Sequence, residues 1–145
     1  MGFRTAAAID DGWLIGGSTN GVAEFADGAT VDGNGTENPG RGVIVELTED
    51  LQLDRVDAIG GDAGSSVARI IPEQDGFVAL GDFGFERDHD AVFGEENPVT
   101  LTSISSDDDP GFDIFVAAWD GDRKLRFARR IQNLSISPRN YPWFI

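Results

Sequence analysis

Two pairs of segments align without a gap within this chain, and this internal repeat limits the folds that the sequence can adopt. Residues 42–59 (GVIVELTEDLQLDRVDAI) match residues 114–131 (IFVAAWDGDRKLRFARRI) at an offset of 72. Upstream, residues 11–21 (DGWLIGGSTNG) match residues 75–85 (DGFVALGDFGF) at an offset of 64. The matching segments occur in the same order, which indicates one supersecondary unit used twice, with a longer insertion in the second copy.

The periodicity inside each unit is typical of β-strands. Short apolar runs bounded by Gly and Asp recur along the chain, and no helical stripe extends over 11 or more residues. The predicted strands are 3–9, 12–18, 42–48 and 53–59 in the first unit, and 66–71, 76–83, 113–120 and 124–131 in the second. We therefore predict an all-β fold of two four-stranded antiparallel, blade-like β-meanders, a partial β-propeller with no substantial helix.

The chain length of 145 residues suits one domain. We expect a single all-β domain over 1–145, made of two repeats at about 3–61 and 65–131 and followed by an aromatic tail at 132–145. The connections 19–41 and 84–112 are expected to be acidic loops, each joining the second strand of its unit to the third. Trp13 and Phe77 occupy matching positions and are expected to be core residues.

The second unit carries a family resemblance. Residues 60–84 (GGDAGSSVARIIPEQDGFVALGDFG), followed by 113–131 (DIFVAAWDGDRKLRFARRI), resemble the repeat of bacterial and archaeal β-propeller proteins, and more distantly the pyrroloquinoline-quinone type of propeller. The resemblance implies radially packed blades. Arg55 and Phe127 stand where that repeat usually has a tryptophan in its fourth strand, and no quinone-binding constellation is visible, so dehydrogenase chemistry is not carried over.

Two blades do not close a ring, because propellers need about four to eight. Three alternatives follow: a fragment of a longer propeller, an assembly of several copies, or a small sandwich whose sheets resemble blades. Uncovered sheet edges must be protected, and exposed aromatic residues mark interfaces. We therefore expect a protein partner, by self-association or through further blades. The expected interface residues are Arg126, Arg129, Tyr141, Trp143 and Phe144.

The charge of the chain is strongly acidic. Its 26 acidic and 11 basic residues give a net charge of −15, Asp outnumbers Glu 18 to 8, and Lys124 is the only lysine. A nucleic-acid partner is not expected, because phosphate binding needs a basic surface. Self-repulsion at this charge is screened by salt, so we expect adaptation to high salt. The alternative is an ordinary acidic secreted domain.

The N-terminus lacks a signal-peptide pattern, and no run is long enough to span a membrane. Localisation therefore stays open between the cytoplasm of a salt-accumulating organism and part of a larger secreted protein.

Calcium is the one cofactor that the acidic connections suggest, since it prefers hard oxygen ligands at alternating positions. The candidate ligands are Asp32, Asn34, Glu37, Asp107 and Asp109. Glu37 and Val43 replace the sixth-position glycine and the twelfth-position glutamate of an EF-hand loop, so a solvated acidic loop is the favoured interpretation.

No catalytic residue is assigned from the sequence. His89 is the only histidine, there is no cysteine, and no Gly-x-Ser-x-Gly motif occurs. The predicted function is a non-enzymatic binding or assembly module. The alternatives are a fragment of a propeller enzyme, hydrolase or quinone-type, and a calcium-stabilised extracellular domain.

Overall fold

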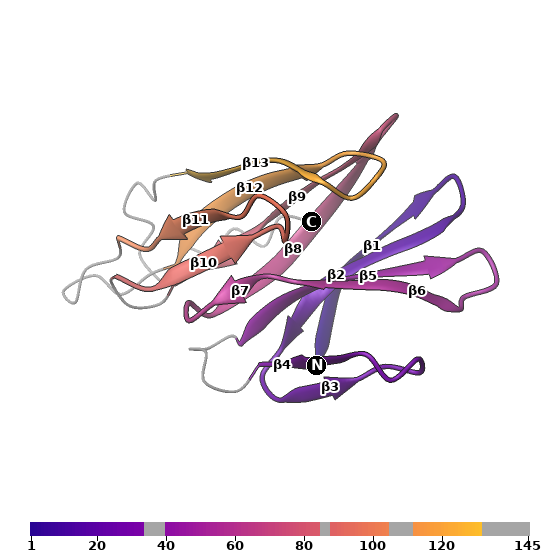
Figure 1. Cartoon of the computed structure of the whole chain (residues 1–145), viewed down its shortest axis with the longest axis horizontal. Coiled ribbons are helices and arrows are strands. Elements are labelled where there is room, and N and C mark those ends of the chain that lie inside the picture. The colour runs from indigo at the N-terminus through magenta and orange to yellow at the C-terminus, as the bar shows by residue number, and fades with distance from the viewer. Residues whose placement is uncertain (34–39, 85–87, 105–111, 132–145) are drawn as a thin grey trace.

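The computed structural model describes residues 1–33, 40–84, 88–104 and 112–131, and two four-stranded antiparallel sheets dominate it (Figure 1). The first sheet contains β1 (Gly2–Ile9), β2 (Gly12–Thr19), β5 (Arg41–Thr48) and β6 (Leu53–Ala58), in that order. The second contains β8 (Ser65–Glu73), β9 (Gly76–Phe83), β12 (Asp113–Trp119) and β13 (Leu125–Ile131). The predicted all-β fold with two blade-like meanders is confirmed.

The two sheets share their irregularities as well as their strand order. The β1–β2 register shifts between Phe3 and Thr5, and the β8–β9 register shifts at the equivalent positions, between Val67 and Arg69. The β5–β6 register shifts between Glu46 and Leu47, and the β12–β13 register shifts at their equivalents, Ala118 and Trp119. Each pair of shifts falls at the offset of the sequence alignment, so equivalent positions can be compared one by one.

The turns that close the outer hairpins also correspond. Leu51 has φ 60° and its equivalent in the repeat, Arg123, has φ 64°. The Leu51 amide donates to the Thr48 carbonyl, and the Arg123 amide donates in the same way to the Asp120 carbonyl. A positive φ is uncommon for residues other than glycine, so the shared conformation makes these two turns structural equivalents.

The two long connections contain strands, and the prediction of plain loops there was wrong. In the first, β3 (Val22–Glu24) and β4 (Thr30–Asp32) form a hairpin. In the second, β10 (Asp90–Phe93) pairs with β11 (Val99–Thr102) and with β7 (Gly60–Gly61). These strands are too short and too rich in Gly, Asp and Thr to show a clear alternation in the sequence.

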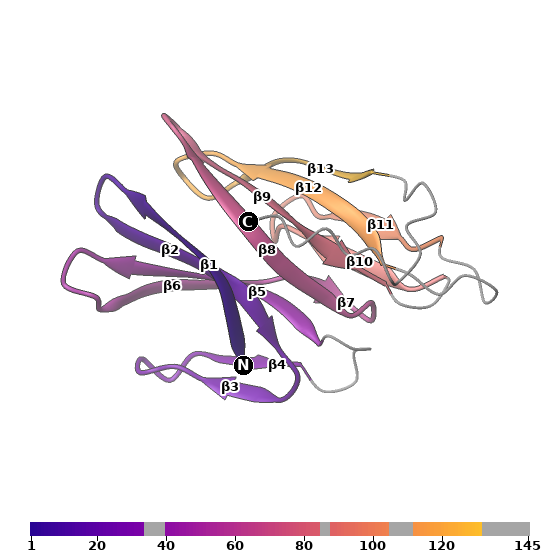
Figure 2. The same ribbon diagram turned by 180° about the vertical axis from the view of Figure 1, so that it is seen from behind.

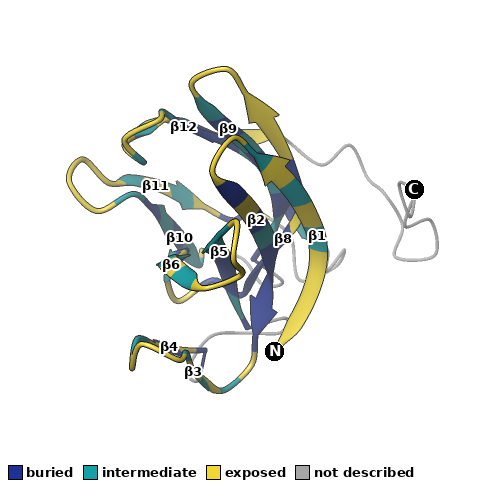
Figure 3. Ribbon diagram, turned by 90° about the vertical axis from the view of Figure 1, so that its right-hand side faces the viewer, coloured by how far each residue is buried: buried dark blue, intermediate teal, exposed yellow. Residues whose placement is uncertain are grey.

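The two sheets pack face to face through β8, which lies against β1, β2 and β5 (Figures 1 and 2). The first half of β8 is buried, while β1 remains largely exposed (Figure 3). Gly16 permits the close approach, because a Cβ there would lie 2.6 Å from the Val67 side chain and 3.1 Å from that of Ile70. The largest fully buried apolar side chains are Leu14, Val43, Val67, Phe77, Phe83, Phe93 and Phe115.

The described part of the chain forms no helix, and therefore none long and apolar enough to cross a membrane.

Candidate functional site

The contact between the two sheets contains a bidentate ion pair. Glu46, on β5, accepts two hydrogen bonds from Arg123 in the β12–β13 turn, one of them 2.7 Å long between Oε2 and Nε. Both side chains are only 15% exposed. The hydrogen bonding to Glu46 raises the pKa of Arg123. A bidentate, partly desolvated pair of this kind fixes orientation as well as distance.

Aromatic side chains support this ion pair from the second sheet. Phe77 stacks on Trp119 with ring centroids 5.0 Å apart and planes 17° apart. The guanidinium of Arg123 lies over the Phe77 ring, 5.4 Å from its centroid. The expectation that Phe77 is a core residue is therefore confirmed, because its exposure is only 1%.

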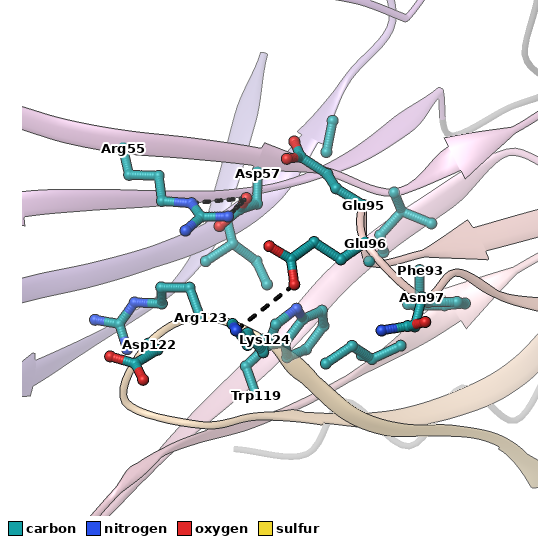
Figure 4. Close-up of a pocket in the computed structure, with 15 residues that line it drawn as sticks. Arg55, Asp57, Phe93, Glu95, Glu96, Asn97, Trp119, Asp122, Arg123 and Lys124 are labelled. Atoms are coloured by element: carbon teal, nitrogen blue, oxygen red, sulfur yellow. Dashed lines mark hydrogen bonds and ion pairs between the residues drawn. The ribbon is translucent and has the colours of Figure 1, made fainter.

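A pocket of about 230 Å³ opens beside this contact (Figure 4). It lies between the first sheet, the β10–β11 turn and the β12–β13 turn. Its charged lining residues are Arg55, Asp57, Glu95, Glu96, Asp122, Arg123 and Lys124. Its apolar lining comes from Ile44, Ala58, Ile59, Phe93, Trp119 and Leu125.

Much of the charge in this pocket is already paired. Arg55 donates to Asp57 at 2.9 Å, and Lys124 lies 3.7 Å from Glu96. Burial raises the pKa of Asp57, and the hydrogen bond from Arg55 opposes that shift. Drug-sized ligands usually occupy pockets of about 300–1,000 Å³. This pocket is smaller than that range, and its three basic side chains are all engaged in ion pairs.

Each sheet also has a second face, on the side opposite the core between the sheets, although Arg4 of β1 reaches Asp82 on that side of the second sheet. On the first sheet, the strand register places Trp13 beside Leu47 and Ala8, and we call this side the first outer face. Its other apolar side chains include Phe3, Ala6, Ile15, Val43, Val45, Leu53 and Val56. Trp13 is 41% and Phe3 54% exposed. The expectation that Trp13 is a core residue was wrong, because Trp13 is exposed near the end of β2, whereas Val43 and Val45 on the same face are at most 3% exposed.

The second sheet has a corresponding second outer face. The register aligns Val78 with Ile71 on one side and with Ala118 on the other. The remaining members are Ser66, Arg69, Leu80, Asp82, Ile114, Val116, Phe127, Arg129 and Ile131. Ile71 is 44% and Ile131 48% exposed. On both outer faces, exposed apolar side chains lie beside buried residues, since Val43, Val45 and Ala118 are at most 3% exposed. Exposed apolar patches mark interaction surfaces.

The two described arginines of the predicted interface differ. Arg126 forms an ion pair with Glu73 of the same chain at 2.7 Å, with both side chains more than 40% exposed. Arg129 is exposed on the second outer face, with its guanidinium 6.0 Å from the centroid of the Phe127 ring. The other three interface candidates, Tyr141, Trp143 and Phe144, lie outside the described residues.

Of the calcium candidates, only Asp32 is described. It is an exposed residue of β4, paired in register with Val22. Asn34, Glu37, Asp107 and Asp109 lie outside the described ranges. Within those ranges, no three His, Asp or Glu side chains are close enough together to hold a metal ion.

His89 lies at the start of the β10–β11 hairpin, with Nδ1 3.6 Å from an oxygen of Asp62. Its backbone amide donates to the Ser103 hydroxyl at 3.2 Å. Asp90 accepts a hydrogen bond of 2.6 Å from the Thr102 hydroxyl. These contacts connect the start of β10 to its neighbours and give His89 and Asp90 structural roles.

Asp82 is the acidic member of the second outer face, and its pKa is strongly shifted. Burial raises that pKa from 3.8 to about 6, against the opposing charge of Arg4, whose guanidinium lies 3.9 Å away. The folded chain therefore takes up this proton at a higher pH than the unfolded chain does. Protonation of Asp82 favours folding as the pH falls from about 6 towards 4, and the charged form opposes folding above pH 6.

Asp82→Asn tests this linkage. We expect the variant to raise the free energy of unfolding by about 2 kcal/mol at neutral pH, less than the full effect of the raised pKa because the side chain is 26% exposed. The difference from wild type should vanish near pH 4. Urea unfolding at several pH values measures it, and an equal difference at neutral pH and at pH 4 would contradict the linkage.

Sequence reasoning missed Glu46 and Leu51, although the repeat contained a signal for both. The offset of 72 pairs Glu46 with Ala118 and Leu51 with Arg123. At both positions, the unit that makes the internal contact has a charged residue and the other unit has an apolar one.

Comparison of the chain with protein-family models, curated proteins and solved structures found no match.

Proposed function

We propose that this chain is a non-enzymatic assembly module built from β-propeller-type repeats and adapted to high salt. The observation that carries the proposal is the pair of apolar outer faces, one on each sheet. Trp13 and Ile71 stand at least 41% exposed on these faces. A further blade or a second copy would remove both from water.

The pocket supports a non-enzymatic role. Its basic groups have partners, because Arg55 pairs with Asp57, Arg123 with Glu46 and Lys124 with Glu96. An anionic substrate group would have to compete with the carboxylates that already hold these basic side chains. Of the three pairs, the one between Arg123 and Glu46 joins the two sheets, which suits a role in holding blades together.

The net charge of −15 supports adaptation to salt. Like charges on separate copies repel in dilute buffer, and salt reduces that repulsion by shortening the Debye length to about 3 Å at 1 M. High salt also strengthens the burial of apolar surface when the ions are excluded from the protein. Both effects favour assembly as the salt concentration rises.

Size-exclusion chromatography with light scattering tests this function. We expect the 15.6 kDa chain to form a defined oligomer in molar KCl and to dissociate on dilution into low salt. A folded monomer in molar KCl at every concentration, with its β-sheet circular dichroism intact, would contradict the proposal.

A further inference from the structure

We propose that copies of this chain associate head to tail, with the second outer face of one copy packed on the first outer face of the next. This contact would repeat the internal contact between the two sheets. The inference rests on the proposed assembly function and names the surfaces that carry it.

The repeat indicates that these two faces are of complementary kinds. Trp13 corresponds to Phe77 at the offset of 64, so the first outer face corresponds to the side of the second sheet that packs inside the chain. Leu14 corresponds to Val78, so the buried side of the first sheet corresponds to the second outer face. Inside the chain, one kind of face packs on the other kind. The two outer faces correspond to these same two packed faces, so packing one outer face on the other would repeat the internal contact.

The ion pair at the internal contact has an apolar counterpart between copies. At the offset of 72, Glu46 corresponds to Ala118 and Arg123 to Leu51. Continuing the internal contact therefore places Leu51 of one copy over the strand position of Ala118 in another. Ala118 itself is 0% exposed, so Leu51 would meet its half-buried register neighbours Val78 and Phe127. Leu51 is 64% exposed, in a turn of positive φ. Exposure of this apolar side chain to water does not stabilise the chain. Burial against a second copy gives it a partner.

Side-chain size is exchanged in the same way. Inside the chain, the large Ile70 packs against Gly16. At the offset of 64, Ala6 is the equivalent of Ile70 and Leu80 is the equivalent of Gly16. In the proposed contact, the small side chain is therefore on the first strand of a unit and the large one on the second strand. Each pair combines one small and one large side chain, which is the arrangement that fills space between packed faces.

Charge also complements across the proposed contact. Inside the chain, Asp57 lines the pocket with the β12–β13 turn and interacts with Arg123. The equivalent of Asp57 is Arg129, and it would face the β5–β6 turn of the next copy, which carries Glu49 and Asp50. A basic residue thus meets an acidic turn, as expected for a heterologous interface.

Heterologous contacts close into rings when the rotation between copies allows it. Propellers close with about four to eight blades, so two blades per chain imply a ring of about two to four copies. The repeated relation between the two sheets supplies the rotation, which favours a closed ring over an open filament.

Two substitutions, one on each side, test the proposed contact. Leu51→Asp places a charge in the β5–β6 turn, on the first-sheet side of the proposed contact. Ile71→Glu places a charge on the second outer face. Both residues are exposed within the chain, at 64% and 44%, so folding should tolerate the changes. Val22→Glu is the matched control, because Val22 is 63% exposed on the β3–β4 hairpin, outside both four-stranded sheets. We expect each test variant to weaken assembly in molar KCl by at least about tenfold, and the control to assemble like wild type.

Mixing the two test variants is the decisive step. Each retains one intact face, so a head-to-tail contact predicts a heterodimer of one Leu51→Asp chain and one Ile71→Glu chain, and nothing larger. A mixture that stays monomeric, or assembly that neither substitution weakens, would overturn the inference while leaving the proposed function standing. A wild-type chain that is monomeric throughout would overturn both.

Discussion

Glu46→Ala and Arg123→Leu together should leave the chain nearly as stable as wild type, although each change alone destabilises it. Arg123→Leu should lower the free energy of unfolding by about 3 kcal/mol, because it leaves the Glu46 carboxylate partly buried without its partner. Glu46→Ala should cost less, about 2 kcal/mol, because Asp54 and Asp57 still act on the guanidinium.

The repeat already contains the residue combination that the double variant would create. It rebuilds at the internal contact the Ala118 and Leu51 combination that occurs at the equivalent positions. An apolar pair of suitable size can replace a buried ion pair with little loss of stability.

Urea unfolding of the four chains in molar KCl measures the coupling between these two residues. Arg126→Leu is the control, because its exposed pair with Glu73 should contribute less than about 1 kcal/mol. A double variant less stable than either single variant would contradict the interpretation.

Gly76→Ala should strongly destabilise the chain, by about 4 kcal/mol. Gly76 begins β9 with φ 115°, and a Cβ there would lie 2.0 Å from the Trp119 carbonyl oxygen. The clash is with backbone of the neighbouring strand, which cannot move without breaking the sheet. Strain of about 1–3 kcal/mol from the backbone conformation adds to an overpacking cost of similar size.

Gly28→Ala separates these two contributions. Gly28 also has a positive φ, 85°, but a Cβ there meets nothing within 4 Å. We therefore expect a loss of only about 1–2 kcal/mol from the backbone conformation alone. Thermal unfolding of both variants gives the comparison, and equal losses would show that the clash with Trp119 is not felt.

The strands of the two meanders were predictable from the sequence because their pattern is local. Apolar runs bounded by Gly and Asp mark each strand, and the repeat marks which strands belong together. The short strands β7, β10 and β11 were not predictable in this way. Gly60 and Gly61 form β7 only because Ala91 and Val92 of β10 come to lie beside them, and these two segments are far apart in the sequence.

The candidate site was predicted only in part, because its geometry depends on which face of each sheet is covered. Trp13 and Phe77 look alike in the sequence, yet Phe77 is buried and Trp13 is 41% exposed. The difference arises because, in the described chain, only one of the two equivalent faces packs on a neighbouring sheet. Arg126 likewise looks available for a partner in the sequence, but Glu73 of its own chain lies 2.7 Å away.

Chemical cross-linking tests the head-to-tail contact most directly, because the chain has no native cysteine. Leu51→Cys combined with Arg129→Cys places one thiol on each side of the proposed contact. Asp57→Cys with Arg123→Cys places the equivalent pair inside one chain, where both residues line the same pocket. A short bismaleimide in molar KCl should join the first pair into covalent multimers that stop at the size of the ring, and should join the second pair without increasing the mass. Monomers alone from the first pair, under conditions where the internal pair reacts, would contradict head-to-tail assembly.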